Sequence, residues 1–497
     1  MPVNGHDLWL ILPFILLLAA GALAIVADMF IGRNERAAIP FVSLGGVVAA
    51  ACTLVSQWGA NEDAFGGTIR VDDFSIVLGL AALGATALSV LMSISYVRAA
   101  KVDFGEFYAL MLTACAGALL LAQANDLIGI FLSIEILSIS VYCLTGITRD
   151  REKSSEGAMK YFIMGAFSTG FMLYGIALLY GASVSTSALA SAGPAAGDAA
   201  SLRLSTLAHI PTGNGLFLAG TALFLIGILF KIGAVPFHAW TPDAYEGAPA
   251  PVTGFMAATV KAGAFAALLR AALIAFPALA HEWSTLLALL AAATMVVGNL
   301  FALAQTNFKR LLAYSSIGHT GYLLIGVVVS GLSPTASAGV LYYVIAYAIM
   351  TVGSFGLVSL LSREGGEVED IPQFNGLASR RPGLAAALTV FMASLAGIPP
   401  TAGFMGKLLI FREAIRFDYT WLALIGIATS MLSAYYYLKI VVAMYMREPE
   451  KGEEFALSSD RWGAGLALAA AAAGTILIGL LPSRFIEWSL AGVRSLL

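Results

Sequence analysis

The sequence predicts an all-α polytopic membrane protein with about fourteen transmembrane helices. Of its 497 residues, 59% are hydrophobic and only 11% are charged, whereas soluble domains have about 25% charged residues. Apolar runs close to the roughly 20 residues that cross a bilayer recur from one end of the chain to the other. No soluble core could hide so many apolar residues, so a soluble globular protein is excluded.

Polar, glycine-rich or proline-containing stretches divide the apolar runs into the expected helices. The fourth and fifth helices are separated only at Asn125 and Asp126, and the twelfth contains Pro399 and Pro400. In chain order, the expected helices cover residues 9–30, 37–57, 74–97, 106–123, 127–147, 158–181, 215–237, 252–275, 284–305, 311–330, 337–361, 383–411, 419–446 and 463–481.

The distribution of Lys and Arg predicts the orientation of the chain. An even number of crossings places both termini on one side, and the odd-numbered connections hold about twice as many Lys and Arg residues as the even-numbered ones. We therefore expect both termini outside the cytoplasm. The start of the chain has no basic residue before Arg33, so we interpret the first apolar run as a retained helix rather than a signal peptide.

Composition also excludes several kinds of partner and cofactor. The net charge is -3 and no long basic run is present, so we expect no nucleic-acid binding. Cys52, Cys115 and Cys143 lie singly in apolar stretches, without a CxxC motif or a Cys/His cluster. We therefore predict that this chain holds no metal, iron-sulfur cluster, haem or disulfide framework.

Five charged residues lie inside apolar segments, where charges are not expected: Glu135, Lys231, Lys261, Lys407 and Lys439. A charge at mid-bilayer costs on the order of 2.5–3.5 kcal/mol, so such groups usually face a hydrated interior and serve transport. The alternative for the lysines is that each ammonium extends to the membrane surface while its stem stays buried. The short carboxylate of Glu135 has no such reach.

Two of these lysines lie beside expected helix breaks. Pro236 cannot donate a hydrogen bond to the carbonyl of Ile232, next to Lys231. Pro399 and Pro400 interrupt the twelfth helix about two turns before Lys407. Irregular backbone at membrane depth is tolerated where it lines a wet or protein-filled interior, and paired broken helices are typical of transporters.

These residues suggest a proton pathway. A carboxylate about 4 Å from an ammonium attracts it by roughly 4 kcal/mol at an effective dielectric constant near 20, so moving Glu135 away from Lys231 would favour release of a proton. Lys261 could then accept that proton. His319 is a candidate relay because histidine titrates near neutrality, although a buried histidine is as often structural.

Three stretches resemble the antiporter-like proton-channel subunits of respiratory complex I. They are KIGAVPFHAWTPDAYEGAPAPVTGFMAATVKAGAF (231–265), TNFKRLLAYSSIGHTGYLL (306–324) and GIPPTAGFMGK (397–407). The same family includes subunits of multi-component sodium/proton antiporters. Within it, Lys407 stands where one other subunit typically has a glutamate, and the chain is expected to lack the long lateral helix of another.

The resemblance implies two inverted five-helix repeats, each with a broken helix. They would follow three N-terminal helices and precede the last helix and tail, which gives segments 1–105, 106–275, 284–446 and 447–497. It also implies that Glu135, Lys231, Lys261 and Lys407 match the glutamate of helix five and the lysines of helices seven, eight and twelve. Glu156 and Lys160 match secondary charged positions less clearly.

The family further implies a proton-translocating, non-redox subunit of an NADH:quinone oxidoreductase in the bacterial inner membrane. FMN, iron-sulfur clusters and a quinone would be held by other subunits of this hetero-oligomer, and the partners of the chain would be other membrane-arm subunits and lipid. Two alternatives remain open at this stage. One is a subunit of a sodium/proton antiporter, and the other is a structural subunit whose charges only hold its neighbours together.

Overall fold

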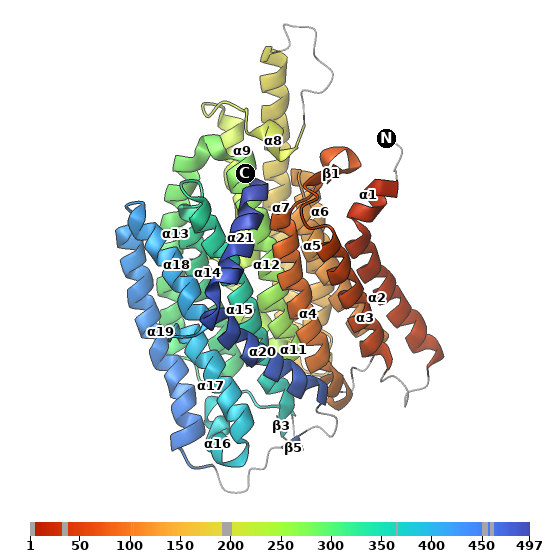
Figure 1. Ribbon diagram of the computed structural model, residues 1–497, viewed down its shortest axis with the longest axis vertical. Helices are drawn as coiled ribbons and strands as arrows, with labels where there is room; N and C mark the ends of the chain where they lie inside the picture. The colour runs from red at the N-terminus through yellow and green to blue at the C-terminus, as the bar shows by residue number, and fades with distance from the viewer. Residues whose placement is uncertain are drawn as a thin grey trace.

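A computed structural model describes residues 5–31, 38–100, 102, 104–190, 201–363, 366–449, 456–457 and 462–497. Long helices lie side by side along the long axis of the molecule, and the first and last described helices, α1 (Gly5–Leu10) and α21 (Pro482–Leu496), reach the same end of the bundle (Figure 1). This arrangement agrees with an even number of crossings. The expected all-α polytopic fold is confirmed.

Twenty-one α-helices are described, and short strands and 3-10 or π turns join some of them. The helices are α1 (Gly5–Leu10), α2 (Leu12–Phe30), α3 (Ile39–Ser56), α4 (Asp73–Ala99), α5 (Gly105–Gln123), α6 (Leu127–Thr145), α7 (Glu152–Ala190), α8 (Leu204–Leu207), α9 (Gly215–Ile232), α10 (Trp240–Gly247), α11 (Ala250–Phe255), α12 (Lys261–Arg270), α13 (Ala280–Leu303), α14 (Phe308–Val328), α15 (Pro334–Leu360), α16 (Leu377–Arg380), α17 (Pro382–Ala396), α18 (Ala402–Arg416), α19 (Thr420–Met446), α20 (Trp462–Leu480) and α21 (Pro482–Leu496).

The strands form two small antiparallel sheets outside the helix bundle. One sheet pairs β1 (Glu62–Ala64) with β2 (Ile69–Val71). In the other, β3 (Leu361–Arg363) pairs with both β4 (Gly366–Glu367) and β5 (Ala456–Leu457). The non-α turns are η2 (Phe65–Gly67), η3 (Met256–Val260), η4 (Ala271–Ala275), η5 (Pro277–Leu279) and η6 (Ile371–Phe374).

Thirteen helical segments among the described residues are long and apolar enough to cross a membrane. The one remaining expected helix is the twelfth, which contains Pro399 and Pro400. It is broken into α17 and α18, as its sequence predicts. The spans at Ala250–Ala275 and Phe308–Val328 are almost entirely buried, whereas that at Leu12–Phe30 is mostly open to the surroundings. The helices that carry Lys261 and His319 are therefore central.

Several boundaries differ from the predicted ones for clear physical reasons. Helix α9 ends at Ile232 rather than at residue 237, because Gly233 takes a left-handed conformation (φ 73°) that only glycine adopts readily. Helix α7 continues to Ala190, beyond the predicted end at 181. The span Ala250–Ala275 contains two π-helical turns, η3 and η4, and η3 ends immediately before Lys261.

The last crossing, Trp462–Leu480, agrees with the predicted 463–481, and a further helix follows it directly. Helix α20 ends where Gly479 lies against the backbone of Pro400 and Thr401, beside the break between α17 and α18. Helix α21 then continues, so that Gly492 packs against Phe74 in the first turn of α4. The predicted C-terminal tail is therefore a packed helix.

Candidate functional site

The first helix break positions Lys231 at the end of α9. Its buried ammonium donates hydrogen bonds to Ser138 Oγ on α6 at 2.8 Å and to Tyr161 OH on α7 at 3.1 Å. The same Nζ lies 5.1 Å from the ring centre of Tyr161 and 5.6 Å from that of Tyr142. Hydroxyls and aromatic faces thus replace water around a buried cation.

Glu135 lies one turn before Ser138 on α6, yet it does not touch Lys231. Neither of these two described residues forms an ion pair, and the buried Oε1 atom of Glu135 has no hydrogen-bond partner. An unpaired carboxylate oxygen in the interior is costly. The expected ion pair between Glu135 and Lys231 is therefore not formed in this structure, and Ser138, one turn after Glu135 on α6, contacts the ammonium instead.

Lys261 is held by one face of α14. Its ammonium donates to Ser316 O and Ser316 Oγ, each at 2.6 Å, and to Thr320 Oγ1 at 2.7 Å. The Thr320 hydroxyl in turn donates to the carbonyl of Ile232 at 2.8 Å. This is the carbonyl expected to lack a donor next to Lys231, so a single hydroxyl connects the first helix break with Lys261.

His319 lies on the same helix, in contact with two tyrosines. Its Nδ1 is 2.6 Å from Tyr343 OH and its Nε2 is 3.1 Å from Tyr437 OH. A neutral imidazole has one donor nitrogen and one acceptor nitrogen, and the two hydroxyls can serve both. Tyr437 also hydrogen-bonds Ser315. His319 is thus part of a buried network of hydroxyl groups.

The second break positions Lys407. Helix α17 ends at Ala396, and Gly397 takes the left-handed conformation with φ 84°. Lys407 reaches back from α18 and donates to Leu395 O at 2.9 Å, Ala396 O at 3.2 Å and Ser430 Oγ at 2.8 Å. It thereby satisfies carbonyls that the interrupted helix leaves free.

Aromatic and amide groups lie between the His319 region and Lys407. The ammonium of Lys407 lies 4.8 Å from the ring centre of Tyr322. The Nδ2 of Asn299 donates to Tyr322 OH at 3.2 Å, and Tyr436 OH donates to Asn299 Oδ1 at 2.9 Å. The three lysines are therefore each enclosed by polar and aromatic groups, and α14 contributes Ser316 and Thr320 beside Lys261 and Tyr322 beside Lys407.

The less clear candidates, Glu156 and Lys160, lie elsewhere. Lys160 forms ion pairs with Glu156 at 2.6 Å and with Asp243 at 2.7 Å, in a charged network near the beginning of α7. They do not contact Lys231.

Sequence reasoning missed one fully buried ion pair. The guanidinium of Arg270 forms two hydrogen bonds with Asp72, at 2.8 and 2.9 Å, and both side chains are completely buried. Arg270 also donates to Ala122 O. The only signal in the sequence is that Asp72 precedes an apolar run as a helix N-cap, which does not identify its distant partner.

Sequence reasoning also missed the hydroxyl partners of the lysines. Ser138 follows Glu135 by three residues, and Thr320 follows Ser316 by four. This spacing places Ser138 on the helix face of Glu135, and Ser316 and Thr320 together on one face of their helix. It is the signal that could have identified them.

Known proteins resemble the whole chain. Residues 124–433 match the family described as NADH:quinone oxidoreductase/Mrp antiporter, TM. NADH-quinone oxidoreductase subunit N of Trichlorobacter lovleyi is 42% identical, and the alignment covers 98% of this chain and 97% of that protein.

Two solved structures have the same fold. A chain of respiratory complex I from Thermus thermophilus with bound aureothin is 34% identical, with a TM-score of 0.79 over 96% of this chain and 98% of that one. A chain of the Mrp complex from Dietzia sp. DQ12-45-1b also has a TM-score of 0.79, over 99% of this chain and 98% of that one, but is only 22% identical. The similarity to the Mrp chain shows a shared fold only.

Proposed function

Because the chain belongs to the subunit N family of NADH-quinone oxidoreductase, we propose that its protons travel by way of Glu135, Lys231, Lys261 and Lys407. The chain is a proton-translocating subunit of the membrane arm of this complex and assembles with other membrane-arm subunits. Family membership sets the activity, and the proposal concerns the route that the protons take.

One observation carries the proposed route. The Thr320 hydroxyl accepts from Lys261 Nζ and donates to Ile232 O, the carbonyl that follows Lys231 in the chain. A buried lysine with only a structural role would need hydrogen-bond partners of its own. It would not need a partner that also bonds the broken helix end beside Lys231, as Thr320 does. The arrangement supports a proton handover from Lys231 towards Lys261.

Glu135 would control this handover. Its Oε1 has no hydrogen-bond partner, whereas the ammonium of Lys231 is held by Ser138 and Tyr161. If a movement brought the carboxylate within about 4 Å of the ammonium, their attraction of roughly 4 kcal/mol would hold the proton on Lys231. In this scheme the separated arrangement is the one that releases it.

A cavity of about 1090 Å³ offers a path for protons to the first lysine. It is lined by residues of the connection between α6 and α7, including Arg151, by Tyr96 on α4 and by Glu367 on β4. Tyr142, whose ring contacts the Lys231 ammonium, also lines this cavity. We propose that water in this cavity delivers protons to Lys231, and that they leave on the other side by way of Lys407.

The remaining features of the proposal follow from the family. Segments 106–275 and 284–446 would be the two inverted repeats, between the N-terminal helices 1–105 and the C-terminal segment 447–497. The chain would lie in the bacterial inner membrane with both termini in the periplasm. It would have no redox centre, because FMN, iron-sulfur clusters and quinone would be bound by other subunits. His319 would relay protons through its two tyrosine contacts.

The route is tested with Lys231→Ala in the assembled complex in membrane vesicles. We expect NADH:quinone turnover and proton pumping to fall, while the amount of assembled complex and NADH oxidation by an artificial acceptor are unchanged. Lys439→Ala is the matched control, because Lys439 also lies in a long membrane helix but outside the route. Normal pumping by the Lys231→Ala complex would refute the route, and loss of assembly alone would indicate a structural role.

A further inference from the structure

A network of charged residues lies at the end of the bundle away from the chain termini, where the β3 and β4 strands are found (Figure 1). We call it the ion cluster. Its acidic members pair with its basic members at N–O distances between 2.5 and 3.5 Å. The members are Glu156, Asp243, Glu246, Glu367, Glu369, Arg151, Lys153, Lys160, Lys309 and Arg310.

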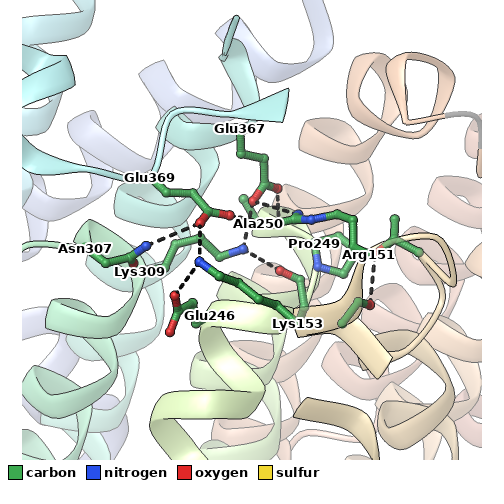
Figure 2. A network of polar contacts seen from close by, with 12 residues as sticks. Arg151, Lys153, Glu246, Pro249, Ala250, Asn307, Lys309, Glu367 and Glu369 are labelled. Carbon is green, nitrogen blue, oxygen red and sulfur yellow. Dashed lines mark hydrogen bonds and ion pairs between the residues drawn. The ribbon is translucent and has the colours of Figure 1, made fainter. Parts of the chain in front are cut away.

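Figure 2 shows that Glu367 and Glu369 point from the strand segment towards residues of three other elements. Glu367 accepts from Lys309 on α14 at 2.7 Å and from the backbone N–H of Ala250 on α11 at 2.9 Å. Glu369 accepts from Arg151, which precedes α7, at 2.5 Å. The cluster therefore joins segments that are more than 200 residues apart in the chain.

Arg310 is the member that joins α10 to α14. Its Nη1 lies 2.7 Å from Asp243 Oδ1 and 3.0 Å from Glu246 Oε2. The two acids are three residues apart and share one face of α10. The Arg310 side chain is 32% exposed, and an ion pair with this much exposure contributes little to stability. The contacts of Arg310 therefore matter more for the relative position of α10 and α14 than for the stability of the fold.

Helix α10 leads from the ion cluster to Lys231. Trp240, in the first turn of α10, stacks on Tyr161 with ring centres 4.0 Å apart and planes 3° apart. Tyr161 OH accepts a hydrogen bond from Lys231. Asp243 follows Trp240 by one turn, so a shift of α10 at the cluster would also move the ring that packs against the partner of Lys231.

Helix α14 leads from the same cluster to Lys261. Arg310 lies near its beginning, and Ser316 and Thr320, which hold the Lys261 ammonium, follow on the next turns. Helices α10 and α14 also pack directly against each other. The relative position of these two helices thus sets the surroundings of Lys231 and those of Lys261 together.

We infer that Arg310 is a positioning residue that holds α10 in register with α14 and so aligns the Lys231 and Lys261 pockets for proton transfer. This inference rests on the proposed route. Arginine suits the task because its planar fork presents several N–H donors in fixed directions and can engage two carboxylates at once. Lysine presents a single ammonium and would hold the two acids less precisely.

The test compares Arg310→Gln, Arg310→Lys and Arg447→Gln complexes in vesicles. We expect Arg310→Gln to assemble but to lose NADH:quinone turnover and pumping by between about 10-fold and 100-fold, the range that misplaced reacting groups give. Arg310→Lys should recover part of this activity. Arg447, exposed and outside the ion cluster, is the control, and its replacement should change nothing.

The outcomes separate this inference from the route itself. Full turnover and pumping by Arg310→Gln, with Lys231→Ala still defective, would overturn the role of Arg310 and leave the route intact. Normal activity in both variants would refute the route. Equal losses in Arg310→Gln and Arg310→Lys would show that the geometry of the guanidinium is needed and that the charge alone is not enough, which supports the positioning role. If Arg310→Gln does not assemble, Glu246→Gln removes only one of the two carboxylates, and unchanged turnover in that variant would overturn the inference.

Discussion

Replacing Thr320 with valine removes the one hydroxyl shared by Lys261 and the first helix break. Valine has nearly the same shape as threonine but lacks its hydroxyl, so the change deletes the hydrogen bonds and leaves their other partners in place. Two groups lose a partner: Lys261 Nζ, at 2.7 Å, and Ile232 O, at 2.8 Å. The ammonium keeps both contacts with Ser316, whereas no other hydrogen bond to Ile232 O is described in the structure.

The size of the effect follows from the orphaned carbonyl. A buried polar group left without a partner costs about 1–3 kcal/mol. If the proton handover passes through this contact, the same energy raises its barrier, and turnover falls between about 5-fold and 140-fold because 1.4 kcal/mol corresponds to a factor of ten. Thr320→Ser keeps the hydroxyl and should retain most of the activity.

The assay measures protons pumped per NADH oxidised, and turnover per assembled complex, in sealed membrane vesicles. Thr475→Val is the matched control, because Thr475 is fully buried and its hydroxyl donates only to Ala471 O in its own helix. Wild-type turnover and pumping by Thr320→Val would refute the handover through Thr320. So would an equal loss in Thr320→Val and Thr475→Val, since the effect would then be general to buried threonines.

Two further predictions concern ion pairs away from the proposed route. Burial would raise the pKa of Glu367, but Lys309, the Ala250 N–H and Arg151 outweigh this effect and hold the pKa below the usual 4.5. The stability advantage of wild type over Glu367→Gln should therefore be constant above pH 4.5 and vanish as the pH falls further. Thermal melting of the purified complex across this pH range measures the difference, and a difference that does not change with pH would contradict the prediction. Asp72→Asn should destabilise the complex by about 3–5 kcal/mol in denaturation experiments, because it leaves Arg270 charged and buried without its partner. Arg70 is the control: it is partly exposed, its Nε lies 3.7 Å from Asp72 Oδ2, and Arg70→Gln should cost less than about 1 kcal/mol.

The sequence predicts the membrane crossings well because a helix that crosses the bilayer must itself be apolar over about 20 residues. The separation of α5 from α6 is an example, since Asp126 caps α6 by accepting from the Gly129 N–H. The position of the first break was harder to predict. Pro236 indicates a break nearby, but the helix ends at Gly233, whose left-handed conformation depends on the packing that follows.

The candidate charges are recognisable from sequence, but their partners are not. A lysine in an apolar run is conspicuous because of its cost in the membrane. The groups that satisfy it lie on other helices: Ser138 is 93 residues from Lys231, and Thr320 is 59 residues from Lys261. Serines and threonines also occur in membrane helices without such roles, since many, like Thr475, only bond their own backbone. Tertiary contact decides between the two cases.

The two lysines beside helix breaks differ in the partners that surround them, and this difference bears on how each of them can release a proton. Ser138 and Tyr161 offer Lys231 hydroxyls, which can donate or accept, so the same partners serve a charged or a neutral amine. Lys407 instead has two partners that can only accept, the carbonyls of Leu395 and Ala396, and one hydroxyl, that of Ser430. Lys231 can therefore release a proton by rotation of its partners' hydroxyls. When Lys407 releases its proton, the neutral amine keeps two N–H donors for the two carbonyls and has to accept a hydrogen bond from Ser430, so release there depends on the rotation of this single hydroxyl.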